Sequence, residues 1–300
     1  MTACAALRRD LDGLYPIVDP GLNIGKGPVV IGNVPEKSKG IVRRVCTYVE
    51  ENVVNPLLQK YDLLRKKTSS VAGGDVPVYI KRLGADENGG PQAYTNGREI
   101  GLDESTVPET NLFYRLAERL AKYKGKSKIA NYLYEKLKRP VDNLVHNLTH
   151  EGFHIHTQIG LEPDYPEYDG QNFISDLYHA TKEHLAKKMP EYFAERLAEK
   201  VIIPIIEGLN QGMTYQAILG KDTNREIKEE ARKDPTSYAR LAEVSAVALD
   251  KTGEESPADF YRSYVKEGYK KAKNYVKKFM ESLGDCFGPP KANACAYATI

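Results

Sequence analysis

The sequence predicts an α+β fold, in which a small N-terminal sheet with helices is followed by a mainly helical C-terminal half. Residues 76–83 (VPVYIKRL) are rich in the β-branched and aromatic side chains that favour strands. Residues 93–103 contain Asn96-Gly97, a two-residue signal for the turn of a β-hairpin. From Glu109 onward, apolar residues recur every three to four positions in nearly every segment, which is the spacing of amphipathic helices.

The elements before the hairpin follow from the same kinds of pattern. Residues 1–35 are rich in Gly and Pro and predict loops around one short strand, near Val29–Ile31. Residues 37–64 carry apolar side chains at helical spacing and predict a long helix, which Pro56 is expected to kink because proline lacks an N–H. Together with the two strand segments above, these residues make up the small sheet and its first helix.

The rest of the chain predicts a series of helices that end at Gly and Pro residues. We expect two structural parts: residues 1–160, which end in the helix over 140–159, and a helical part over residues 161–300. The expected helices cover residues 109–124, 128–138, 140–159, 172–188, 191–208, 213–219, 236–250 and 257–283.

The composition is that of a globular protein, with 41% apolar and 28% charged residues. The 43 Lys and Arg residues exceed the 41 Asp and Glu residues by two, and so small a net charge does not indicate nucleic acid as a partner. No window approaches the ~18 uninterrupted apolar residues of a membrane-spanning helix. The order of charges at the N-terminus is unlike that of a signal peptide, and the four cysteines include no CxxC pair. We therefore expect a soluble cytoplasmic protein with neither nucleic acid nor a membrane as partner, and the composition leaves its oligomeric state open.

The histidines are concentrated in one part of the chain, between residues 146 and 184. Among them is the sequence His150-Glu151-Gly152-Phe153-His154, which has the form H-E-x-x-H. A chain of this composition would contain roughly 0.01 such motifs by chance. The six histidines are His146, His150, His154, His156, His179 and His184.

This motif lies within an apolar stripe at helical spacing. On a helix, its histidines and its glutamate can take different roles in a metal site. His150 and His154 are one turn apart on the same face, so two imidazoles can bind one metal ion. Glu151 is rotated by about 100° about the helix axis from His150, so its carboxylate can reach a water molecule bound to the metal instead of the metal itself. Zinc with three protein ligands and an open fourth position lowers the pKa of a water molecule toward ~7, and a neighbouring carboxylate can then take the proton.

A third ligand is required, and Glu207 is the candidate that its setting favours. It closes the apolar run over residues 201–206 (VIIPII), where a partly buried carboxylate needs a partner such as a metal ion. Gly208 beside it would permit the close approach of another backbone. The metzincin extension of the motif is absent, because Thr157 and Gly160 stand where Gly and His would be needed. Competing carboxylates are Asp176, Glu183, Glu191 and Glu195, and the last three lie, like Glu199, in charged stretches typical of solvated helix faces.

An HExxH helix that follows a hairpin strand (AYTNGREIGLD) and precedes an EGL segment resembles the gluzincin-type zinc metallopeptidases of the zincin superfamily. The resemblance implies a zincin-like active-site helix, a Zn²⁺ cofactor and a peptide or protein substrate. It implies that His150, His154 and Glu207 bind the zinc and that Glu151 is the catalytic base. It also implies that the strand around Ala93–Leu102 is the edge along which peptide substrates lie by β-augmentation.

Two other functions remain as alternatives. A zincin-fold protein that has lost hydrolysis would keep the same metal ligands and act as a metal-dependent binding or scaffold protein. The basic stretches 122–128 and 270–278 invite a nucleic-acid-binding interpretation, but the second lies over an apolar stripe and is typical of a solvated lysine face.

Four more side chains have open roles. His146 lies one turn before His150 and is either a further ligand or supporting group, or a polar residue of the core. His179 and His184 could orient substrate or stabilise the oxyanion, although exposed surface histidines explain them as well. Tyr215, eight residues after Glu207, is a candidate hydrogen-bond donor to the tetrahedral intermediate.

Overall fold

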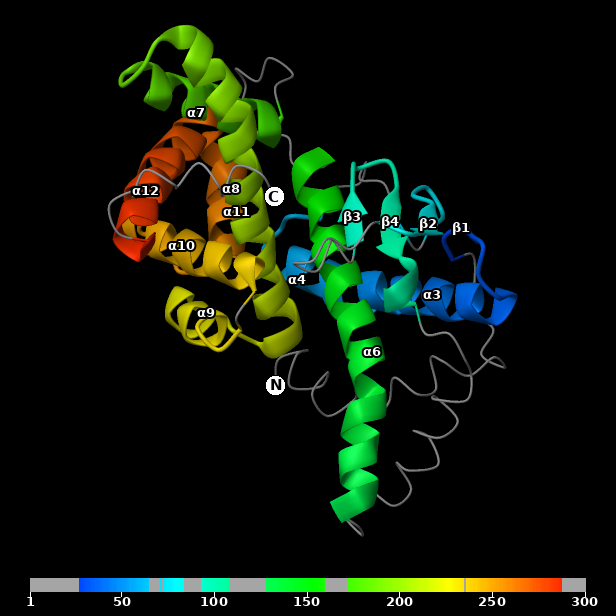
Figure 1. Ribbon diagram of the computed structural model, residues 1–300. Helices are drawn as coiled ribbons and strands as arrows, with labels where there is room; N and C mark the ends of the chain where they lie inside the picture. The colour runs from blue at the N-terminus through cyan, green and yellow to red at the C-terminus, as the bar shows by residue number, and fades with distance from the viewer. Residues whose placement is uncertain are drawn as a thin grey trace. The chain divides into compact units, whose positions relative to one another are not determined.

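The computed structural model describes residues 27–64, 71, 73–83, 93–107, 128–159, 172–234 and 236–287 (Figure 1). It confirms the α+β class, with a small four-stranded sheet near the N-terminus followed mostly by helices. Internal contacts divide the chain into two units. The first comprises Met1–Pro56 and Lys67–Ile155, and the second comprises Leu57–Lys66 and His156–Ile300. The boundary that the sequence predicts, between residues 160 and 161, and the expected helix over 109–124 both fall outside the described residues.

The first unit contains a mixed sheet with the strand order β1-β2-β4-β3. Strands β1 (Val30–Gly32), β2 (Val78–Lys81) and β4 (Ile100–Asp103) are parallel, whereas β3 (Ala93–Thr95) pairs antiparallel with β4. The predicted hairpin over 93–103 is confirmed, and Gly97 takes the positive φ of 81° that its turn requires. Strands β1 and β3 form the two edges of the described sheet, and β4 lies between β2 and β3.

One face of this sheet is buried and the other is partly open. On the open face, the Tyr94 ring covers Gly101 and leaves no room for a Cβ atom there. The buried face contributes to the core of the unit together with helices α3 (Glu36–Val49) and α6 (Lys128–His154), which contact β1 and β3 respectively. The buried side chains on the strands are Val30, Val78, Ile80, Ile100 and Leu102.

The long helix predicted over residues 37–64 is present over residues 36–60, and π-helical turns come just before its proline. Helix α3 (Glu36–Val49) passes through a π-helical segment, η1 (Glu50–Val54), directly into α4 (Asn55–Lys60). Pro56 therefore lies in the turn that follows η1. The wide turns of η1 absorb the change in hydrogen-bond register that a residue without an N–H imposes.

The helix that carries the H-E-x-x-H motif is longer than the sequence predicts. Helix α6 runs without a break from Lys128 to His154 and continues as a π-helical segment, η3 (Ile155–Ile159). The predicted break near Pro140 is wrong, because a proline removes one hydrogen bond without reversing the chain and both of its flanks keep helical spacing. Close packing explains the glycine of the motif: a Cβ atom at Gly152 would lie 3.1 Å from Cγ2 of Val54 in η1.

The second unit consists mainly of helices. The structure joins the two helices predicted over 191–219 into one and divides the one predicted over 257–283 at Gly268, whose φ is 55°. Its helices are α7 (Phe173–Ala186), α8 (Glu191–Leu219), α9 (Asn224–Ala231), α10 (Ser237–Thr252), α11 (Pro257–Glu267) and α12 (Tyr269–Phe287). Within the described ranges, every helix is too short or too polar to span a bilayer.

Helix α8 packs closely against its neighbours at two glycines, four residues apart. A Cβ atom at Gly208 would lie 2.5 Å from the carbonyl oxygen of Leu241 in α10, and one at Gly212 would lie 2.7 Å from Cγ of Pro257 in α11. The sequence predicts a close approach of another backbone at Gly208, and the structure confirms it. The backbone that approaches belongs to α10.

Replacing Gly208 with alanine is expected to lower the free energy of unfolding by about 1–3 kcal/mol, because the carbonyl of Leu241 cannot rotate away as a side chain could. The matched control is Gly284→Ala in α12, where a Cβ atom meets nothing within 4 Å. Since alanine favours a helix over glycine by roughly 1 kcal/mol, the control is expected to be neutral or stabilised. Urea denaturation checks both, and equal stability of the two variants would contradict the close-packing interpretation.

Candidate metal centre

The two motif histidines lie side by side on the last turns of α6. His150 and His154 are 7% and 3% exposed, and their Nε2 atoms are 2.9 Å apart. Their ring planes meet at 67° with centroids 4.6 Å apart, so one ring nitrogen of each is directed at the same small volume. Two nitrogens that bind one tetrahedral zinc at ~2.0–2.1 Å lie about 3.3 Å apart, which is close to the separation seen here.

The packing of α6 explains why these imidazoles are held in place. Leu144, Val145 and Leu148 are buried in the turns before the motif, and Phe153 is buried inside it. These side chains fix the rotation of the helix about its axis, because apolar surface is buried on the side that they occupy. The rotation in turn sets the direction in which the two histidines leave the helix.

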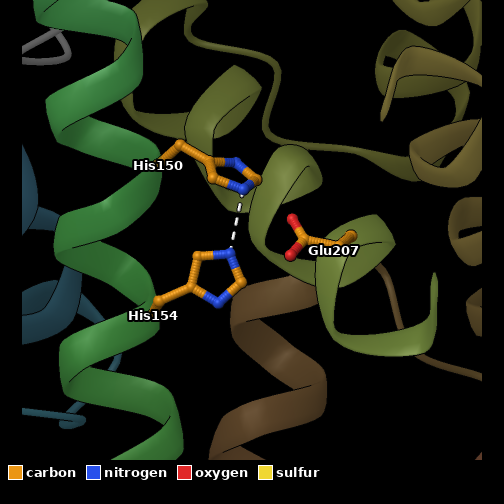
Figure 2. A group of neighbouring side chains, drawn as sticks. All are labelled: His150, His154 and Glu207. Carbon is orange, nitrogen blue, oxygen red and sulfur yellow. Dashed lines mark hydrogen bonds between the residues drawn. The ribbon is translucent and has the colours of Figure 1, made fainter. Parts of the chain in front are cut away.

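Glu207 of α8 completes a group that could hold a metal ion. His150, His154 and Glu207 each offer one ligand atom, and these atoms all lie within 4.8 Å of one another (Figure 2). Glu207 is half-buried. In the described part of the chain, this is the group of His, Cys, Asp and Glu side chains that meets such a condition. It consists of the three residues that the sequence predicts as metal ligands.

Glu151 occupies the position next to His150 and is 5% exposed. On an α-helix, this neighbour leaves the axis about 100° away from His150. Its side chain therefore does not take part in the His150–His154 pair and does not belong to the three-residue group. Its role as catalytic base stays a prediction.

The other histidines do not join this group. His146 is half-buried one turn before His150, and His156 is buried in η3. His179 is exposed on α7, while His184 lies 3.3 Å from the amine of Lys188. Burial lowers the pKa of His184, and the charges of the neighbouring lysines lower it further. The exposed position favours the surface interpretation for His179, whereas His184 is half-buried.

The carboxylates that compete with Glu207 in the sequence have other partners. Glu191 and Glu195 form ion pairs with Lys182, at 3.0 and 2.6 Å. Glu183 accepts hydrogen bonds from Lys273 and Tyr269, which hold the pKa of its carboxyl below the usual value.

Asp176 differs from these three carboxylates because it is buried. Its carboxylate accepts a 2.8 Å hydrogen bond from the hydroxyl of Tyr264, which is also buried. Each of the four competing carboxylates therefore interacts with a hydroxyl or a lysine. Glu207, by contrast, lies with the two histidines.

Tyr215 is part of a core cluster. It packs against Ile227, Ala239, Ala242 and their neighbours, and its hydroxyl donates a 3.2 Å hydrogen bond to Asp234. Burial, more than any other cause, raises the pKa of this hydroxyl. These contacts give Tyr215 a structural role and leave its predicted role as a donor to the reaction unsupported.

The basic stretch over residues 270–278 is largely engaged in ion pairs. Lys273 pairs with Glu183, and Lys278 pairs with Glu281. The same helix buries an apolar stripe that includes Val276. This favours the solvated lysine face over a nucleic-acid interface. The other basic stretch, 122–128, lies outside the described residues except for Lys128.

Three buried polar residues near Glu207 were not singled out by the sequence. The carbonyl oxygen of the Asn210 side chain accepts hydrogen bonds from the hydroxyls of Thr157, at 3.2 Å, and Tyr261, at 3.1 Å. All three side chains are 0% exposed. One signal was available, since Asn210 and Gln211 are polar residues that follow the apolar run over 201–206 and Glu207. The spacing of Thr157 and Tyr261 gave none.

Comparisons with known proteins do not assign this chain to a family. The chemistry of the group formed by His150, His154 and Glu207 is therefore argued from its own side chains. No family model matches the chain, and neither does any curated protein or any solved structure.

Proposed function

We propose that this chain is a zinc-dependent peptidase, in which His150, His154 and Glu207 bind the metal and Glu151 is the general base. The observation that carries the proposal is the convergence of two imidazoles and one carboxylate, whose ligand atoms lie within 4.8 Å of one another. The HExxH spacing supports it, because it supplies a carboxylate beside the ligands that is not itself a ligand.

The donor set favours zinc over the hard divalent cations. Calcium and magnesium prefer sites made of oxygen atoms, whereas imidazole nitrogens suit zinc, copper, iron and nickel. Two histidines and one glutamate are also the ligands of several hydrolytic zinc sites, which keep a fourth position open for water or substrate. The same ligand types bind iron(II) in some oxygenases, so the identity of the metal is part of the test.

A zinc ion bound there would polarise the scissile carbonyl and lower the pKa of the attacking water toward ~7. Glu151 would accept the proton of that water and later deliver it to the leaving amine. The buried position of Glu151 suits this role, because a base shielded from bulk water exchanges its proton with the bound reactants. His150 and His154, as neutral imidazoles, would hold the metal through their facing nitrogens.

The first unit also offers a way to bind a peptide. Strand β3 is an edge of the described sheet, it runs antiparallel to β4, and it packs against α6, the helix of the motif. An extended peptide can add to such an edge through main-chain hydrogen bonds, which suits a peptidase that acts on many sequences. We place the activity in the cytoplasm, because the cysteine pattern does not indicate a disulfide framework.

The purified wild-type chain is expected to retain about one zinc ion per monomer, and the double variant His150→Ala/His154→Ala is expected to lose it. The matched control is His179→Ala/His184→Ala, which removes two imidazoles from α7 and should keep the metal. Elemental analysis measures zinc and iron in all three proteins. A peptide library with and without a chelator tests whether the wild type hydrolyses peptides.

Stoichiometric zinc in the His150→Ala/His154→Ala variant would overturn the ligand assignment. Bound zinc without cleavage of any peptide would favour the alternative, a metal-dependent binding or scaffold protein. Stoichiometric iron in place of zinc would overturn the proposed hydrolytic chemistry.

A further inference from the structure

The hydroxyl–amide cluster of Thr157, Asn210 and Tyr261 joins three elements of the second unit. Thr157 lies in η3, Asn210 in α8 and Tyr261 in α11. The side-chain carbonyl of Asn210 receives both hydroxyls, which uses the two lone pairs that an amide oxygen offers. Because the cluster is fully buried, water cannot replace a hydrogen bond that is removed.

The cluster is adjacent to the proposed metal ligands along the chain. Asn210 comes three residues after Glu207 on the same helix, so the two side chains lie one turn apart on one face. Thr157 comes three residues after His154, in the π-helical segment that continues α6. The hydrogen bond from Thr157 to Asn210 therefore joins the segment just after His154 to the turn of α8 that carries Glu207.

The electrostatics keep Tyr261 in the donor form. Burial raises the pKa of its hydroxyl most strongly, and the negative charge of Glu207 raises it further, while the hydrogen bond with Thr157 acts in the opposite direction. The hydroxyl is therefore neutral and can donate to Asn210.

We infer that Thr157, Asn210 and Tyr261 are positioning residues, which hold the Glu207 turn of α8 and the segment after His154 in the geometry that binds the metal. This inference rests on the proposed metal site. The three residues do not touch the reacting atoms. They act through Glu207, as the outer hydrogen-bond partners of metal ligands do, and a shift of less than 1 Å in a ligand is enough to impair a metal site.

The test separates positioning from a general contribution to stability. Thr157→Val removes the hydroxyl and keeps the shape of the side chain, whereas Thr157→Ser keeps the hydroxyl. Tyr261→Phe removes the other donor. The matched control is Tyr275→Phe, which removes an equally buried tyrosine hydroxyl that is hydrogen-bonded at 2.8 Å to Ser245. Each protein is studied as the full chain by zinc competition against a chelator, by the visible absorption of the Co²⁺ form and by urea denaturation without metal.

Thr157→Val and Tyr261→Phe are expected to weaken zinc binding by about 10- to 100-fold and to alter the Co²⁺ spectrum. Thr157→Ser should restore both properties, and Tyr275→Phe should lower the urea midpoint without changing either. On a cleaved peptide, kcat should fall in the first two variants while KM changes little, because the substrate contacts are untouched.

Wild-type zinc affinity and an unchanged Co²⁺ spectrum in both Thr157→Val and Tyr261→Phe would overturn the inference and leave the metal site standing. If Thr157→Val fails to fold, Tyr261→Phe and its control Tyr275→Phe decide alone. A wild-type protein that binds neither zinc nor Co²⁺ would overturn the proposed function, and the inference with it.

Discussion

Replacing Glu151 with glutamine is expected to lower the rate of peptide hydrolysis by a factor of about 10²–10⁴ while the zinc content stays unchanged. Glutamine has nearly the same shape as glutamate, so the α6 helix and its two histidines should keep their positions. An amide cannot accept the proton of the attacking water, and this single property accounts for the loss. Single-turnover hydrolysis of a cleaved peptide, measured beside elemental analysis of the same sample, checks both parts.

A control for the loss of one negative charge is Glu195→Gln in α8, which removes one of the two carboxylates that pair with Lys182 and should leave turnover unchanged. Wild-type turnover in Glu151→Gln would show that another group takes the proton. Loss of zinc from that variant would show instead that Glu151 is a ligand.

Replacing Glu207 with alanine is expected to weaken zinc binding by about 2–4 kcal/mol, which corresponds to a factor of roughly 30 to 1,000 in the dissociation constant, and to abolish hydrolysis. The variant leaves two imidazoles, whose facing nitrogens can still hold a metal loosely. Zinc competition against a chelator of known affinity measures the change.

The controls for Glu207 are the carboxylates that the sequence also offers. Glu183→Ala, Glu191→Ala and Glu195→Ala remove side chains that pair with lysines, so zinc binding should change little. Wild-type zinc binding by the Glu207→Ala variant would refute the assignment of Glu207. Loss of zinc from one of the three control variants would point to that carboxylate as the ligand instead.

The parts of the fold that could be predicted are those that neighbouring residues determine. Asn96-Gly97 specifies a hairpin through the backbone angles of two residues, and the structure contains it. The H-E-x-x-H segment lies on a helix because apolar residues recur on both sides of it. Glu207 could be singled out because a carboxylate at the end of an apolar run needs a partner.

The errors come from residues whose effect depends on distant packing. Gly208 and Gly212 indicate a break in a helix when they are read alone, yet α8 continues through both because α10 and α11 fill the space that their missing side chains leave. In the cluster around Asn210, the two partners of Asn210 lie 51 and 53 positions away along the chain, so no local sequence pattern predicts it.

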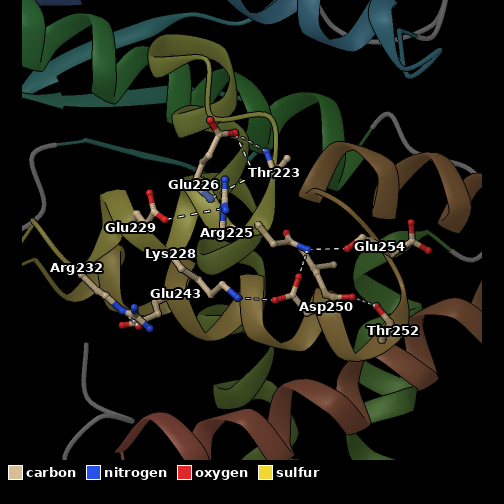
Figure 3. A network of polar contacts seen from close by, with 12 residues as sticks. Thr223, Arg225, Glu226, Lys228, Glu229, Arg232, Glu243, Asp250, Thr252 and Glu254 are labelled. Carbon is tan, nitrogen blue, oxygen red and sulfur yellow. Dashed lines mark hydrogen bonds and ion pairs between the residues drawn. The ribbon is translucent and has the colours of Figure 1, made fainter.

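Helix α9 was missed for a related reason. It has eight residues and little apolar character, and much of what holds it is polar (Figure 3). A capping box between Thr223 and Glu226 starts the helix, and Lys228 forms a 2.5 Å ion pair with Asp250 of α10. The capping box could have been recognised in the sequence, whereas the ion pair joins two helices and could not.

The close contact at Gly208 has a consequence for the metal-free protein. Because the carbonyl oxygen of Leu241 fits where a side chain would otherwise be, α8 cannot turn about its own axis without a collision. The contact at Gly208 therefore restricts the angular setting of the helix, and with it the direction in which the neighbouring residue, Glu207, leaves the helix. A ligand whose direction is set in advance loses little conformational freedom when an ion arrives, so more of the intrinsic bond strength remains as affinity.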